Sequence, residues 1–154
     1  DSDFSNLNIK NINCLKVGND CVDFSFSKAS IDTLESSYTG DKSISLGESS
    51  SLDASNVKLN NGEIGIVCKD NSILRINNFK FENIKLPLAS FVKKPEFQPP
   101  QVFIENTKPF LDNNYLISND VKVFVSGKKL FSNLSSLEVE SKLYGNLYGV
   151  KTRR

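Results

Sequence analysis

The hydrophobic and polar positions of this chain repeat every 22 residues between residues 18 and 88. Two columns follow this step: Val22, Ile44, Ile66 and Leu88, and, two positions later in each repeat, Phe24, Leu46, Cys68 and Ser90. A fixed period of about 20–30 residues is typical of solenoids, in which each repeat buries its apolar face on the next one. The pattern therefore predicts a stack of similar coils.

Within a coil, apolar residues alternate with polar ones, as at Ile64, Ile66 and Cys68 and again at Leu74 and Ile76. This period of two is typical of a strand with one buried face. The alternating stretches are three to five residues long, and Gly, Asn, Asp and Ser separate them. We therefore expect short strands joined by turns, because no amphipathic run is long enough for a helix.

Another arc of each coil carries a second apolar set and a polar column. The apolar sets are Leu7, Ile9, Ile12 and Cys14; Ala29, Ile31, Leu34 and Ser36; Leu52, Ala54, Val57 and Leu59; and Leu74, Ile76, Phe79 and Phe81, with a one-residue slip after the second. The polar column contains Asn11, Thr33, Asn56, Asn78 and Asn106. These side chains either hydrogen-bond to one another along the stack, or occur here because Asn is common in turns. The first interpretation is favoured, because the flanking apolar columns repeat in the same phase.

After Leu88 the period lengthens to 28 residues. Leu74 then aligns with Val102, Leu88 with Leu116 and Ser90 with Ser118, so six residues are inserted within residues 91–100. A loop inserted into a solenoid projects from one face, where binding sites often lie.

These patterns predict one all-β domain, a single-stranded parallel β-helix of about five coils over residues 1–131, with a C-terminal capping segment at residues 132–154. Terminal repeats are normally atypical because an open stack exposes apolar surface and strand edges. The first coil already resembles an interior coil. We therefore expect upstream β-helix coils or another domain to cover the N-terminal end, and the chain to be the C-terminal part of a longer one.

Composition excludes several function classes. The 154 residues contain 19 Lys and Arg against 18 Asp and Glu, so no strong field favours nucleic acid or an anionic membrane. Histidine is absent, which removes the commonest general base and metal ligand. No apolar run is long enough to span a membrane, and no signal peptide is visible, although a leader or upstream region before Asp1 remains open. Cys68 falls in an inward column, whereas spacing alone leaves a disulfide between Cys14 and Cys21 undecided.

The 22-residue coil, its inward aliphatic columns and the Asn column together resemble the right-handed parallel β-helix of the pectin-lyase-like superfamily, over about residues 4–125. Residues 40–48 (GDKSISLGE), 65–70 (GIVCKD) and 93–97 (KKPEF) further resemble β-helix regions of bacterial cell-envelope proteins, including tails of spore-coat-kinase-like domains. The resemblance implies a fold and leaves activity open, because the same coil occurs in lyases, epimerases, adhesins and inert spacers.

For an enzyme, the resemblance implies a polysaccharide lyase or epimerase, in which Lys or Arg removes a proton beside a uronate carboxylate and Ca²⁺ or acidic groups hold the substrate. The candidate residues are Asp20, Asp23, Asp41, Glu48, Lys69 and Asp70. Asp23 should point outward, but Ser45, Val67 and Ala89 follow it in that row, so charges do not accumulate on one face. We favour turn-forming and solubilising roles, a non-enzyme, no metal and no cofactor, with Ca²⁺ only under the lyase alternative.

The inserted loop supplies the ligand-binding candidates Phe91, Lys93, Lys94, Glu96 and Phe97. They either contact a sugar or an anionic glycan, or the two Phe side chains pack the loop onto the coil while the lysines are solvated. The function expected is therefore a non-catalytic, extracytoplasmic module of a bacterial surface protein, structural or polysaccharide-binding. A lyase or epimerase, and an adhesin or phage tail-spike-like fragment, are the alternatives. No nucleic-acid partner and no membrane span are expected.

Overall fold

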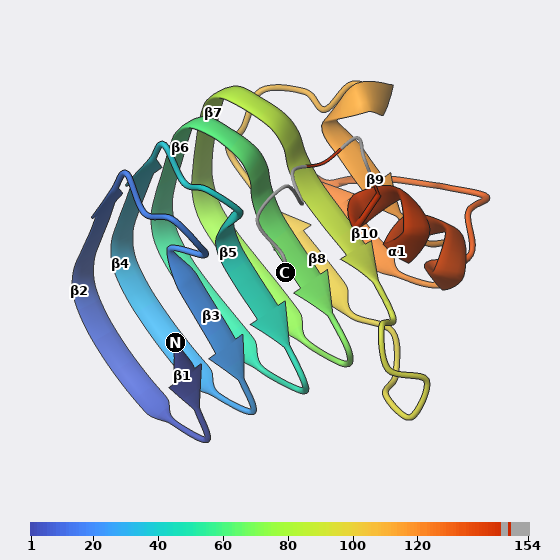
Figure 1. The fold of residues 1–154 in the computed structure, drawn as a ribbon, viewed down its shortest axis with the longest axis horizontal. Helices are drawn as coiled ribbons and strands as arrows, with labels where there is room; N and C mark the ends of the chain where they lie inside the picture. Colours follow the sequence, from blue (N-terminus) through green and yellow to red (C-terminus); the bar gives the residue numbers. More distant parts are fainter. Residues whose placement is uncertain (146–147, 149–154) are drawn as a thin grey trace.

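The computed structural model describes residues 1–145 and residue 148, and it is a parallel β-solenoid of about six turns (Figure 1). The sequence predicts about five coils of this type. The described residues form eleven strands, one 3₁₀ helix and one α-helix in this order: β1 (Ser2–Asp3), β2 (Asn6–Leu15), β3 (Val22–Ser25), β4 (Lys28–Ser37), β5 (Lys42–Gly47), β6 (Ser51–Lys69), β7 (Ile73–Phe91), β8 (Gln101–Ile104), η1 (Asp112–Asn114), β9 (Tyr115–Ile117), β10 (Lys122–Val125), β11 (Lys128–Lys129) and α1 (Ser136–Leu143).

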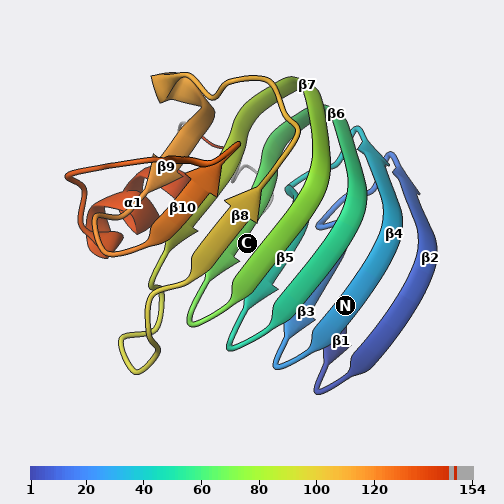
Figure 2. The same ribbon diagram turned by 180° about the vertical axis from the view of Figure 1, so that it is seen from behind.

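The strands form two faces of the solenoid. Face 1 stacks β2, β4, the first halves of β6 and β7, then β8 and β10, and lies toward the viewer in Figure 2. Face 2 stacks β1, β3, β5, the second halves of β6 and β7, and β9. On face 2, Val22 pairs with Ile44 and Ile44 with Ile66, which confirms the 22-residue step.

The strands are longer than the three to five residues that the sequence suggests. β2 and β4 each contain 10 residues, and β6 and β7 each contain 19. The chain bends near Lys10 and Asn11, and at the equivalent places in later coils, where the pairing to the next coil skips one rung and then resumes. Because hydrogen bonds between parallel coils run along the stack, a strand can turn a corner and stay paired.

The Asn column lies at this bend, and its stacking is confirmed. Asn78 Nδ2 donates to Asn56 Oδ1 at 3.2 Å. The amides of Asn56, Asn78 and Asn106 also each donate to a backbone carbonyl of the preceding coil, as Asn106 Nδ2 does to Asn77 O at 2.9 Å. Side chains at a bend that project outward therefore still stabilise the stack of coils.

A serine ladder at the turns before face 1 has no counterpart in the sequence predictions. The backbone N–H of Ser5 donates to Ser27 Oγ, that of Ser27 to Ser50 Oγ, and that of Ser50 to Ser72 Oγ, at 3.0, 3.0 and 3.2 Å. Ser27, Ser50 and Ser72 are buried. Their spacing follows the same step and slip as the apolar sets, so this periodicity was the available signal.

The apolar side chains form an interior cluster and a second cluster outside face 2. The expectation that Ile64 faces the interior with Ile66 is wrong, because Ile64 belongs to the outer cluster together with Val67. The strand alternation breaks at Gly65, where the pairing between β5 and β6 skips one rung. Ile64 therefore points outward although its neighbours in sequence suggest the reverse.

The alignment after the inserted loop also needs a correction. On face 1 the 28-residue step holds, since Leu74 pairs with Val102. On face 2 Leu88 pairs with Tyr115, not with Leu116, and Ser90 pairs with Ile117, not with Ser118. A shift of one residue reverses the side-chain direction. Leu116 consequently joins the outer cluster and Ile117 the interior.

Helix α1 explains why the outward row of face 2 is apolar. Ser135 and Glu138 form a reciprocal capping box at its start. Val139 and Leu143 then pack on the outer cluster, which contains Val67 and Ala89. Part of the segment 132–154 thus covers the side of the solenoid; residues 146–147 and 149–154 lie outside the described residues.

The two ends of the solenoid differ. At the C-terminal end, β11 pairs antiparallel with β10, and Leu130 and Phe110 pack against the interior cluster. At the N-terminal end, the inward side chains of β2, among them Leu7 and Ile9, are only half-buried. The first coil is therefore open among the described residues.

Candidate functional site

The predicted ligand-binding loop leaves the solenoid between β7 and β8 and protrudes from the stack in Figure 1. Asp70 holds its base, because its Oδ1 accepts the backbone N–H groups of Lys93 and Lys94 at 2.7 and 2.9 Å. The N–H of Asn71 donates to Gln98 O at 2.6 Å on the other side. The buried carboxylate of Asp70 therefore positions the loop.

Phe91 lies at the end of β7 and is completely buried. Its ring contacts that of Tyr144 edge to face, with centroids 6.3 Å apart, and Lys93 Nζ lies 5.3 Å from the Tyr144 ring centroid. Phe91 thus has no ring face exposed to a sugar, whereas Lys93 and Glu96 are exposed.

The tip of the loop folds toward the N-terminal coils. Lys94 Nζ forms an ion pair with Glu48 two coils earlier. The contact with Lys94 is the main reason that the pKa of Glu48 lies below its usual value, and a hydrogen bond from Ser25 is the second. Phe97 lies 6.2 Å from Phe26 between ring centroids. The loop is therefore fastened at its tip as well as at its base.

Phe97 extends an aromatic ladder that the sequence predictions missed. The rings of Phe4 and Phe26, which are 22 residues apart, stack in parallel with their centroids at 4.9 Å. Both residues have positive φ angles, and Phe4 is 80% exposed. Because Phe26 has a ring on each side, the open ring face belongs to Phe4, at the N-terminal end of the ladder.

The acidic and basic candidates fall into small pairs on the outer side of face 2. Lys42 is 3% exposed, and its ammonium contacts Asp20 at 3.1 Å and Asp41 at 2.7 Å. Asp20 Oδ1 also accepts the backbone N–H of Lys42 at 3.0 Å. Two carboxylates thus balance one buried ammonium, which corrects the expectation that charges at these turns are solvated.

Lys69 is the second lysine on this surface. Burial lowers its pKa, the Lys93 and Lys42 ammonium groups lower it further, and the carboxylates of Asp23 and Asp70 oppose the shift. A cavity of about 620 Å³ lies beside Asp23, Asp41 and Lys42. In the described part of the chain, no group of three or more His, Cys, Asp or Glu is placed to hold a metal ion.

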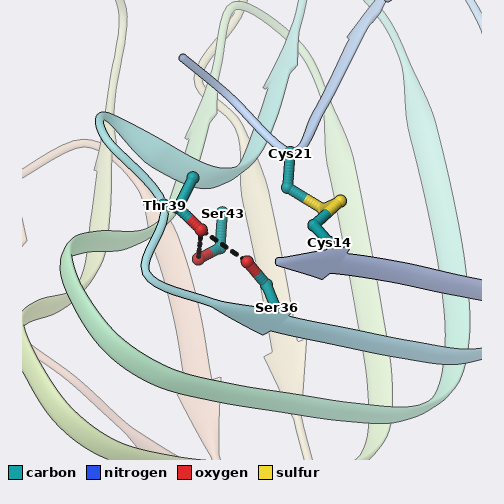
Figure 3. The surroundings of a disulfide bond; sticks show 5 residues. All are labelled: Cys14, Cys21, Ser36, Thr39 and Ser43. Carbon is teal, nitrogen blue, oxygen red and sulfur yellow. Dashed lines mark hydrogen bonds between the residues drawn. A yellow bond between two sulfur atoms is a disulfide. The ribbon is translucent and has the colours of Figure 1, made fainter. Parts of the chain in front are cut away.

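Cys14 and Cys21 form a disulfide across the connection between β2 and β3, with Cα atoms 5.8 Å apart (Figure 3). In the next coil Ser36 and Ser43 take these places, and Thr39 joins them: its Oγ1 lies 2.5 Å from Ser36 Oγ and 3.4 Å from Ser43 Oγ. In the third coil the equivalent residues are Leu59 and Gly65. The Leu59 side chain fills the space there, because a Cβ added to Gly65 would lie only 3.2 Å from Leu59 Cδ1. The same position is therefore held by a disulfide in the first coil, by hydrogen-bonded hydroxyl groups in the second and by an apolar side chain in the third.

Comparisons with known proteins add no relative: no protein-family model, curated protein or solved structure matches the chain. No helix among residues 1–145 and 148 is long and apolar enough to cross a membrane. The chain is a parallel β-solenoid, and its function has to be argued from its own surfaces.

Proposed function

We propose that this chain is a non-catalytic structural module, the C-terminal part of a longer parallel β-helix in an extracytoplasmic bacterial surface protein. The observation that carries the proposal is the difference between the two ends of the solenoid. The C-terminal end is closed by β11, Leu130 and Phe110, whereas the N-terminal coil presents its interior.

Three features stop at the open end. Among the described residues β2 pairs only with β4, so its other edge has unpaired backbone N–H and C=O groups. The aromatic ladder ends at Phe4, with an open ring face. The serine ladder ends at Ser5: the Oγ atoms of Ser27, Ser50 and Ser72 each accept the backbone N–H of the preceding coil, whereas Ser5 Oγ has no such donor among the described residues. A further parallel coil upstream would satisfy all three with contacts that the chain already uses between its own coils.

The charged candidates support a non-catalytic function. Asp70 binds the loop backbone, Glu48 pairs with Lys94, and Asp20 and Asp41 pair with Lys42. A proton-abstracting lysine needs a free amine beside the substrate, and the Lys42 ammonium is held by two carboxylates. The lyase alternative therefore depends on Lys69, whose pKa burial lowers. The disulfide is typical of oxidising compartments, which supports an extracytoplasmic location. The resemblance of residues 40–48, 65–70 and 93–97 to β-helix regions of bacterial cell-envelope proteins supports a surface protein.

A duplication tests whether the open end accepts another coil. A second copy of residues 6–27 is placed directly after residue 27, and a scrambled version of these residues serves as the control. We expect a higher Tm and, by hydrogen exchange, slow amides in the second of the two copies, which becomes an interior coil. A duplicated coil that stays unprotected and leaves Tm unchanged, as the scrambled one should, would overturn the proposal.

Catalysis is tested separately on uronate polysaccharides, with and without Ca²⁺. The expected result is no chain shortening and no ultraviolet absorbance from unsaturated products. Accumulating product would favour the lyase alternative, and loss of that activity in Lys69→Met would place its base on face 2.

A further inference from the structure

A second row of positive-φ residues lies at the corner where the chain passes from face 1 to face 2. The row contains Lys16, Tyr38, Asn61 and Asn83, with φ between 51° and 58°. Asn tolerates this conformation, whereas a bulky aromatic residue is costly there. Tyr38 nevertheless adopts it with 54% of its surface exposed. A strained and exposed side chain of this kind points to a role outside folding.

Tyr38 borders a groove of about 580 Å³ that crosses three consecutive coils. At about 4.8 Å per coil the groove is roughly 10 Å long. Its floor contains Gly62 and Ile84, where a Cβ on Gly62 would stand 3.3 Å from Ile84 Cδ1 and fill the space. Two cross-coil rungs border it: the amides of Asn61 and Asn83, and the Glu63–Lys85 ion pair.

The polar groups of the groove keep hydrogen-bonding capacity. Asn83 Nδ2 donates to Asn61 Oδ1 at 3.1 Å, which leaves Asn61 Nδ2 and Asn83 Oδ1 without a partner within the described part of the chain. The Tyr38 hydroxyl likewise forms no hydrogen bond with the described residues. The Glu63–Lys85 pair at 3.1 Å brings one charge of each sign, so the groove has no net charge. A ligand would therefore find an aromatic ring, donors and acceptors, and no net electrostatic attraction.

We propose that this Tyr38 groove binds a neutral oligosaccharide. A sugar combines an apolar C–H face, which packs on an aromatic ring, with hydroxyl groups that both donate and accept hydrogen bonds. The groove spans more than one ring, so an oligomer fits better than a single sugar. An extended peptide is disfavoured because the backbone here is paired between coils: the N–H of Tyr38 donates to Asn60 O and Asn61 O. Polyuronates are disfavoured by the neutral lining.

This site is distinct from the open end and from the 91–100 loop, so its test is independent of the proposed structural function. The protein is screened on immobilised neutral oligosaccharides, namely gluco-, manno-, xylo-, galacto- and N-acetylglucosamine oligomers, with uronate oligomers and extended peptides on the same array. We expect binding to at least one neutral series, followed by calorimetry with the free oligomer.

Tyr38→Asn is the decisive variant, because it places in this coil the residue that the next two coils use. We expect binding at least about tenfold weaker, or about 1.4 kcal/mol. Relief of the positive-φ strain should leave Tm equal or higher by about 2–4 °C. Tyr38→Phe should retain most of the affinity. Phe26→Asn is the matched control: it changes another exposed, positive-φ aromatic residue on a different row and should bind as the parent does.

Several results would overturn this assignment. They are silence of the whole neutral series, binding confined to uronates or peptides, and a Tyr38→Asn variant with unchanged affinity. A marked fall of Tm in Tyr38→Asn would also refute it, since Tyr38 would then serve packing.

Discussion

The disulfide between Cys14 and Cys21 allows a quantitative test of how the first coil is held. The two residues are 7 positions apart, so the bond closes a ring of about eight residues. In the chain-entropy description this ring restricts the unfolded state and stabilises the fold by about 2.5 kcal/mol at 25 °C. The perturbation is Cys14→Ser with Cys21→Ser, which copies the residues that the second coil has at these places.

The loss should be local. Backbone pairing in a solenoid joins only neighbouring coils, and β2 of the first coil is paired on one side among the described residues. The double variant should therefore open β2 and β3 without unfolding the later coils. The second coil shows that serines fit this position, since Ser36 and Ser43 share a hydrogen-bond cluster with Thr39. Steric damage is therefore not expected to add to the effect.

The assay is native-state hydrogen exchange resolved by residue. Amides of β2 that donate to β4 should exchange about 70-fold faster in the variant, the factor that corresponds to about 2.5 kcal/mol. Amides in the second half of β7 should keep their protection. The parent protein with reduced thiols is the control and should match the variant. Unchanged exchange in β2, or equal acceleration throughout the chain, would refute the description of the first coil as a separately opening unit.

Three further predictions concern the interior and the loop. Ile66→Asp should unfold the chain, because Ile66 is 0% exposed and an unpaired carboxylate there would be desolvated. The control Ile66→Val should lower the free energy of unfolding by only about 1 kcal/mol. A melting curve of the Asp variant that matches the parent would contradict the inward direction of this column. Ser50→Ala should destabilise by about 1–3 kcal/mol in urea titration, because the buried N–H of Ser27 loses its acceptor at 3.0 Å. The lowered pKa of Glu48 means that its ion pair with Lys94 stabilises the fold above the ordinary value of 4.5, and this contribution disappears as pH falls through the folded-state pKa. Lys94→Ala should accordingly lower Tm at pH 7 and leave it unchanged at low pH; an equal loss at both would refute the pairing.

The stack and most of its register could be predicted from sequence because a solenoid turns spatial neighbours into a constant sequence step. Val22 and Ile44, or Asn56 and Asn78, lie side by side because coils repeat, so the period alone identifies the contact. The slip after the second apolar set was likewise readable, as Ser36 pairs with Leu59.

The candidate sites were much less predictable. Phe91 and Phe97 belong to one loop in sequence, but the first is buried under Tyr144 and the second reaches Phe26. Nothing in the sequence indicated Tyr38 as a site residue, because its positive φ angle cannot be predicted for a residue type that ordinarily avoids this conformation.

The sequence by itself determined the coil, its 22-residue step and the residues that stack between neighbouring coils, because these contacts are set by period and polarity. Only the tertiary structure decided which apolar residues face outward and where the inserted loop is fastened. Ile64 and Leu116 are as apolar as any interior residue, and their burial on the outer side depends on α1, a segment far away in the chain that follows no period. Periodicity reports contacts between repeats, and it carries no information about a non-repeating element that packs against them.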